Sequence, residues 1–107
     1  MIHHSTALSI IRNITPVFTR NRFLCGLYGS CLLEEQGHDI DILAIPLHRS
    51  ANNLSVLLGL EERGWRCTAN LESGILADSA IMTFKDHPDF ILDIRFSRFE
   101  NKFEDKY

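Results

Sequence analysis

Two acidic residues at the start of an apolar strand are the strongest chemical signal in this sequence. Asp39 and Asp41 flank Ile40 in the run that ends at Pro46. Successive side chains of a strand alternate between its faces, so the two carboxylates point the same way, about 6.5–7 Å apart. Like charges at this spacing repel each other unless a cation is bound between them. The pair therefore predicts a site for one or two divalent ions, Mg²⁺ or Mn²⁺.

A third carboxylate lies in a later apolar run, residues 90–96, where Asp93 stands in the middle and Arg95 follows two positions on. An acidic residue inside a strand of this kind is uncommon unless it is paired. One interpretation is a buried ion pair of Asp93 with Arg95 or with a residue of another strand. The other is a metal carboxylate beside an arginine that contacts phosphate. Two ions held by three such carboxylates could stabilise both oxygens of a phosphoryl displacement.

Gly29 and Ser30 stand between a strand expected over residues 23–28 and a short helix expected over 31–36. A glycine at such a junction lets backbone come close to a ligand. The free N–H groups of a first helical turn attract an anion. Each motif alone is common, but together they predict a nucleoside triphosphate at the helix start, neutralised from the opposite side by the cation on the acidic pair.

The apolar periodicity predicts one α+β domain with a mixed sheet of four or five strands and helices packed on it. Helices are expected over residues 5–19, 31–36 and 51–63. The first is expected to end near Pro16, and the second is expected to end at Gly37. Strands are expected over residues 23–28, 39–46, 65–71, 80–85 and 90–96, the last two joined by a five-residue hairpin loop at 85–89.

Composition narrows the classes of function. The 107 residues predict a single domain over 1–107, and the net charge of −3 argues against an extended nucleic-acid surface. No stretch approaches the ~20 apolar residues that span a bilayer, so no membrane contact is expected. The three cysteines have no regular spacing. Cys25 and Cys67 are expected to be buried, and all three cysteines, including Cys31, are expected to stay reduced. These features favour a cytoplasmic protein.

The motifs together resemble the signature of the DNA polymerase beta-type nucleotidyltransferase superfamily. The matching parts are Gly29-Ser30, then the acid-hydrophobic-acid strand Asp39-Ile40-Asp41, then Asp93 between hydrophobic residues. The resemblance spans roughly residues 23–96, and the minimal nucleotidyltransferase group is similar in size. It implies a nucleotidyltransferase fold, two divalent ions, and transfer of a nucleoside monophosphate from ATP or another nucleoside triphosphate to an acceptor hydroxyl.

The resemblance also implies roles for single residues. By motif position, Gly29 and Ser30 hold the triphosphate, Asp39 and Asp41 bind both metal ions, and Asp93 binds the ion that activates the acceptor. The acceptor is a protein side chain, a small molecule or an RNA end. Among small single-domain members an antitoxin role recurs, in which the domain pairs with a helical HEPN-type toxin and adenylylates it.

A second function stays open beside catalysis. The helix expected after Ser30 carries Glu34 and Glu35, where many members place an arginine that helps with phosphates. A chain that keeps the fold without activity would act by binding a protein, as a sequestering antitoxin or a phage-type inhibitor. The oligomeric state is open in both cases.

Overall fold

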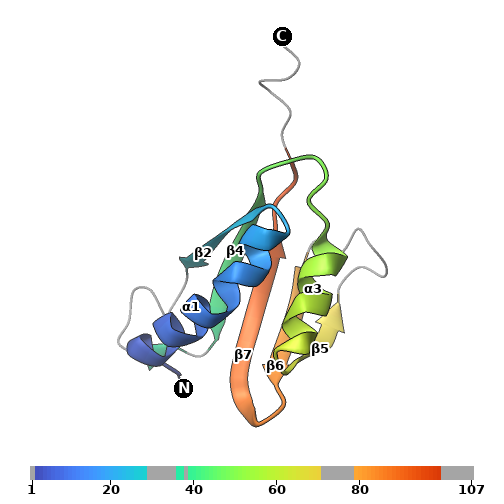
Figure 1. Cartoon of the computed structure of the whole chain (residues 1–107). Helices are drawn as coiled ribbons and strands as arrows, with labels where there is room; N and C mark the ends of the chain where they lie inside the picture. Colours follow the sequence, from blue (N-terminus) through green and yellow to red (C-terminus); the bar gives the residue numbers. More distant parts are fainter. Residues whose placement is uncertain (1, 29–35, 38, 71–78, 100–107) are drawn as a thin grey trace.

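The computed structural model describes residues 2–28, 36–37, 39–70 and 79–99. Within these ranges, two helices pack on one face of a five-stranded sheet (Figure 1). The helices are α1 (His4–Arg20) and α3 (Asn53–Glu62), and the strands are β1 (Ile2–His3), β2 (Phe23–Tyr28), β3 (Gln36–Gly37), β4 (Ile40–Pro46), β5 (Trp65–Asn70), β6 (Ser79–Phe84) and β7 (His87–Phe96). The architecture confirms the predicted α+β class and mixed sheet.

The order of the large sheet is β2-β4-β7-β6-β5. Its two central strands, β4 and β7, run parallel, and the three other neighbouring pairs are antiparallel. A second, two-stranded sheet joins β1 to β3. The two strands that carry the acidic motifs are therefore direct neighbours at the centre of the large sheet.

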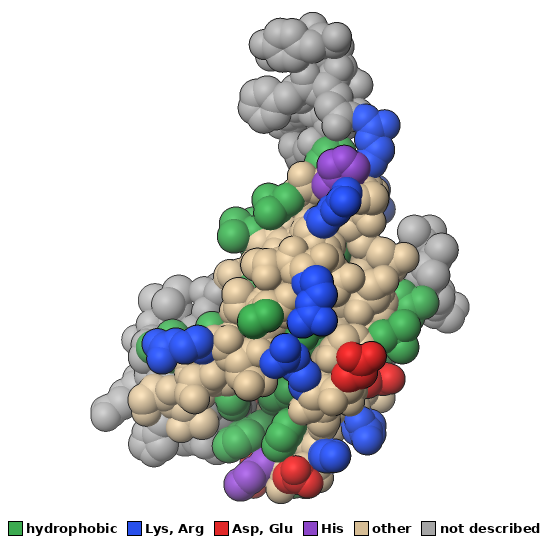
Figure 2. Space-filling model, viewed as in Figure 1, with side chains coloured by type: hydrophobic (Ala, Val, Ile, Leu, Met, Phe, Trp, Pro, Cys, Tyr) green, Lys and Arg blue, Asp and Glu red, His purple; other side chains and the backbone are tan. Residues whose placement is uncertain are grey.

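Side-chain alternation gives this sheet two different faces. Along β4, Ile40, Ile42 and Ala44 are fully buried, whereas Leu43 and Ile45 are 37% and 38% exposed. The buried set faces the helices, and no other described element covers the opposite face. On the side that carries the helices, Lys and Arg side chains are spread over the surface, with separate hydrophobic side chains between them (Figure 2). The core consists of Ala7, Ile14, Val17, Phe18, Phe23, Ile40, Ile42, Ala44, Val56, Leu57, Leu60, Trp65, Ala80, Met82, Leu92, Ile94 and Phe96.

Both ends of α3 have a local cause. Asn52 precedes the helix in an extended conformation, and its Oδ1 accepts hydrogen bonds from the N–H groups of Leu54 and Ser55 at 2.9 and 3.4 Å. Gly64 follows the last turn with φ +99°, a conformation that side chains disfavour. The predicted helix over 51–63 is thus confirmed, shortened by its cap residues.

The expected end of the first helix near Pro16 is wrong, because α1 continues to Arg20. Proline has no N–H, so the carbonyl of Arg12 lacks the helical hydrogen bond from position 16. Arg12 is exposed, and water can reach it. Burial of Val17 and Phe18 after the proline holds the helix to the sheet. Tertiary packing therefore outweighs the local preference of proline.

Three smaller expectations also change. Gln36 belongs to strand β3 and not to a helix, while residues 31–35 lie outside the described residues. The β6–β7 turn has two residues instead of five, because His87 already pairs with Phe84 across a register shift. Cys67 is exposed, since it lies on β5 at the sheet edge. Within the described ranges, neither helix is long and apolar enough to cross a bilayer.

Gly64→Ala is expected to destabilise the fold by about 1–2 kcal/mol, because a side chain at positive φ is strained. A Cβ there would also lie 3.1 Å from the ring of Phe84. Urea unfolding measures the effect. Gly26→Ala is the matched control, since its Cβ would meet only Leu43 O at 3.8 Å. Equal midpoints for the two variants would contradict the assigned strain.

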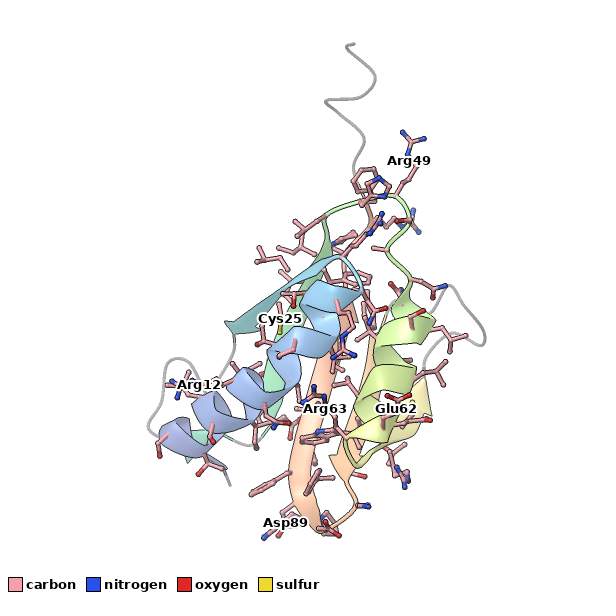
Figure 3. All side chains as sticks on the ribbon, in the orientation of Figure 1. Arg12, Cys25, Arg49, Glu62, Arg63 and Asp89 are labelled. Atoms are coloured by element: carbon pink, nitrogen blue, oxygen red, sulfur yellow. The ribbon has the colours of Figure 1, made fainter. Side chains whose placement is uncertain are left out.

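Cys25 lies on β2 beneath α1 (Figure 3), and burial raises the pKa of its thiol to about 11, partly opposed by a hydrogen bond with Thr15. Alkylation by iodoacetamide at mildly alkaline pH should therefore be at least about tenfold slower at Cys25 than at Cys67, because only the thiolate reacts. Peptide mass spectrometry measures the extent of alkylation at both cysteines over time. The rates should converge in denaturing urea, and equal rates in the folded protein would contradict the shift.

The same pKa has a consequence for stability. Because the thiol pKa is higher in the folded chain than its ordinary value of 9.0, folding favours the neutral form. The contribution is complete below pH 9 and is lost as the pH rises towards 11.

Candidate metal and phosphate site

Asp41 and Asp93 occupy partner positions on the parallel strands β4 and β7. The residues on either side of each are fully buried under the helices, so both carboxylates lie on the opposite, open face. Neighbouring strands are about 4.8 Å apart, and the two side chains start from adjacent backbone positions. Both residues are half-buried. The fold thus brings together two acidic residues that are 52 positions apart in sequence.

The strands on either side place this pair at the centre of the open face. Asp41 is the partner of Tyr28 on β2, and Asp93 is the partner of Ile81 on β6. The predicted triphosphate-binding residues Gly29 and Ser30 follow Tyr28 directly but lie outside the described residues. Their assignment stays a prediction, connected to the acidic pair only through the end of β2.

Asp39 lies in a bend just before β4, two positions from Asp41, and is half-buried. In the described ranges, no group of three His, Cys, Asp or Glu side chains is gathered so that it could hold a metal ion. The three-carboxylate assignment therefore stays a prediction. The residues that the structure does bring together are Asp41 and Asp93.

Arg95 lies on the same open face as Asp93, two residues further along β7, and its side chain is exposed. Its neighbours across the sheet are Leu43 and Ser79. No charged residue among those described is buried, and Asp93 and Arg95 form no ion pair with each other. The interpretation of a buried Asp93–Arg95 pair is therefore wrong. An exposed guanidinium in this place can contact a phosphate group.

The acidic pair suits a hard divalent cation. Carboxylate oxygens are the ligands that Mg²⁺ and Mn²⁺ prefer, and two of them side by side offset the cost of removing water from the ion. Without a cation, two like charges at directly adjacent strand positions destabilise a sheet. The donor set and its placement thus fit the predicted metal.

An aliphatic surface beside the acidic pair was not anticipated from the sequence. Leu24, Leu43, Ile45 and Ile81 all lie on the open face, exposed by 51%, 37%, 38% and 37%. The sequence does contain a pattern that indicates this surface, because residues 42–45 are apolar at every position. Such a run is typical of central strands that are covered on both faces. We define these four residues as the open-face aliphatic surface.

Comparison with known proteins identifies the fold. No family model matches the chain, and no curated protein matches its sequence. Among solved structures, a cytoplasmic RNA terminal U-transferase superposes with a TM-score of 0.67 at 16% identity, covering 89% of this chain and 29% of its own. Cid1, described as having RNA terminal uridylyl transferase activity, gives a TM-score of 0.69 at 16% identity, covering 89% of this chain and 31% of its own.

A second Cid1 structure, described as a poly(U) polymerase, gives a TM-score of 0.59 at 16% identity and covers 85% of this chain. The likeness establishes a shared nucleotidyltransferase fold. The chain spans 29% to 31% of the length of these solved proteins. The minimal nucleotidyltransferase group is not among them.

Asp93→Asn is expected to raise the stability of the metal-free protein by about 0.2–1 kcal/mol, because it removes one of two adjacent like charges. Thermal melts in EDTA measure this gain. In the wild type, added Mg²⁺ or Mn²⁺ should raise the melting temperature, and in Asp93→Asn that rise should be lost. Asp89→Asn, at an exposed position near the start of β7 (Figure 3), is the matched control. A metal-induced rise that survives in Asp93→Asn would contradict the site.

Proposed function

We propose that this chain is a metal-dependent nucleotidyltransferase that moves a nucleoside monophosphate from ATP or another nucleoside triphosphate to an acceptor hydroxyl. One observation carries the proposal: Asp41 and Asp93 are register partners on adjacent parallel strands of a sheet whose fold is shared with nucleotidyltransferases. A repulsive pair of this kind is an unfavourable arrangement unless a cation uses it.

The proposed roles follow the places of the residues. Asp41 and Asp93, with Asp39 from the bend before β4, would hold Mg²⁺ or Mn²⁺. When bound, the ion would neutralise the phosphate oxygens of the triphosphate. Arg95 would add a second positive charge on the same face. Gly29 and Ser30 would bind the triphosphate from the end of β2.

The proposed reaction forms one bond and breaks one. The acceptor oxygen bonds to the α-phosphorus, the bond from that phosphorus to the pyrophosphate oxygen breaks, and pyrophosphate leaves. The proton of the acceptor hydroxyl passes to a water molecule beside Asp93, the carboxylate assigned to the acceptor. The negative charge of that residue favours the departure of the proton.

A protein that covers the open face is part of the proposal. The open-face aliphatic surface adjoins the acidic pair, and central strands with continuous apolar runs are usually covered on both faces. A polypeptide with a matching apolar surface would exclude water from the site and bring its own hydroxyl to the phosphate. Adenylylation of a HEPN-type toxin by an antitoxin is one form of this reaction, and it stays a prediction of the resemblance.

Label transfer tests the proposed function. The protein is incubated with α-³²P-labelled ATP, UTP, CTP or GTP, Mg²⁺ or Mn²⁺, and a cell lysate as the source of acceptor. Label is expected in a macromolecule, and separate protease and RNase treatments identify a protein or an RNA acceptor. Asp41→Asn and Asp93→Asn should each lower transfer by at least about a hundredfold, since a lost metal carboxylate removes charge stabilisation of the transition state.

Asp89→Asn is the control and should keep full transfer, because exposed Asp89 lies near the start of β7, four residues or about 13 Å along the strand from Asp93. Equal labelling by wild type and both site variants would overturn the catalytic proposal. If wild type transfers no label with any of the four nucleotides but retains a lysate protein through the open-face aliphatic surface, the non-catalytic binding function is the better account.

A further inference from the structure

A cleft on the helix-bearing side of the sheet is separate from the acidic site. Its volume is about 380 Å³, and it lies between α1 and the ends of α3, β5, β6 and β7. The lining residues are Ser9, Ile10, Asn13, Arg63, Trp65, Phe84 and Phe90. Phe84 and Phe90 alternate with open-face positions on their strands, so the sheet itself lies between the cleft and Asp41 and Asp93.

Aromatic contacts hold one wall of the cleft. The rings of Trp65 and Phe84 are 5.1 Å apart at 57°, and His87 stacks on Phe90 at 4.5 Å and 12°. The N–H of Lys85 also donates to the carbonyl of Gly64 at 3.0 Å, which ties the end of α3 to the β6–β7 turn. The wall is therefore preformed: Phe84 and Phe90 are partly exposed to a ligand ring, and the buried ring of Trp65 supports Phe84 from behind.

Polar groups stand at one side of this aromatic wall. Arg63 extends between the helices (Figure 3), and its Nη1 donates to the backbone carbonyl of Asn13 at 2.8 Å. Among the lining residues that the structure describes, Arg63 is the one charged residue, and none carries a carboxylate. A guanidinium has five donors, so most remain to bind an anionic group. Ser9 and the side chain of Asn13 add neutral donors and acceptors.

The size of the cleft and its surroundings favour a small molecule over a protein partner. A volume of about 380 Å³ lies within the range of small-molecule pockets. The large hydrophobic side chains that are exposed in the described residues, such as Leu24, Leu47 and Leu58, lie outside its lining. A protein interface would need a wider apolar surround.

We propose that this cleft binds a small planar aromatic molecule that carries an anionic group, with the ring against Phe84 and Phe90, close to the edge of buried Trp65, and the anion on Arg63. The aromatic faces provide the apolar contact, and the positive charge of Arg63 favours anionic ligands over neutral ones. The site is independent of the proposed transfer reaction, because it needs neither metal nor nucleoside triphosphate.

Fluorescence of Trp65 tests the proposal, because it is the one tryptophan of the chain and lies in the wall of the cleft. The probe is 2-naphthoate, added without metal or nucleotide. A saturable change in tryptophan emission is expected, with half-saturation below about 1 mM. Arg63→Gln should weaken binding by about tenfold, as expected for the loss of a charge-assisted contact. Ser9→Phe, an exposed position in the lining, should block binding by filling the cleft.

Two controls make the result decisive. Arg12→Gln, an exposed arginine of α1 outside the lining, should leave the affinity for 2-naphthoate unchanged. The uncharged analogue 2-naphthalenemethanol should bind at least about tenfold more weakly. Thermal melts establish that each variant is folded. No saturable change up to about 5 mM, equal weakening by Arg12→Gln and Arg63→Gln, or equal affinity for the two probes would each overturn the proposal.

Discussion

The parallel pairing of β4 and β7 is the constraint on which the rest of the structure depends. It places two strands with fully buried aliphatic side chains next to each other at the centre of the sheet, with Ile40 beside Leu92 and Ile42 beside Ile94 in the core. The same register sets Asp41 beside Asp93 on the other face. Because strand side chains alternate, burial of the first set requires the second juxtaposition. A shift by one residue would bury the acids and expose the core.

The sheet therefore separates two kinds of chemistry. On the helix side, close packing produces a preformed aromatic cleft with one arginine at its edge. On the open side lie a pair of carboxylates, Arg95 and the open-face aliphatic surface. The first surface is lined by aromatic rings and Arg63. The second combines repelling charges with exposed aliphatic groups, and both features favour binding of a cation and contact with another polypeptide.

Sequence reasoning was accurate where local rules and tertiary packing agree. The helix expected over 51–63 is present as α3, because the cap at Asn52 and the positive φ at Gly64 that end it are properties of single residues. It was wrong at Pro16, where burial of the following turn outweighs the local cost of proline. Cys67 was expected to be buried, but its strand lies at the sheet edge, and strand order is not encoded in a run of residue types.

By itself, the sequence determined that this is an α+β chain with acidic residues at defined positions of two apolar strands, because periodicity and residue type are local properties. Only the tertiary structure decided that Asp41 and Asp93 are neighbours and that Asp93 and Arg95 form no buried pair. It also decided that residues from α1, α3, β5, β6 and β7 meet in one cleft. Strand register and long-range contacts depend on which surfaces bury each other, and no short window of sequence contains that information.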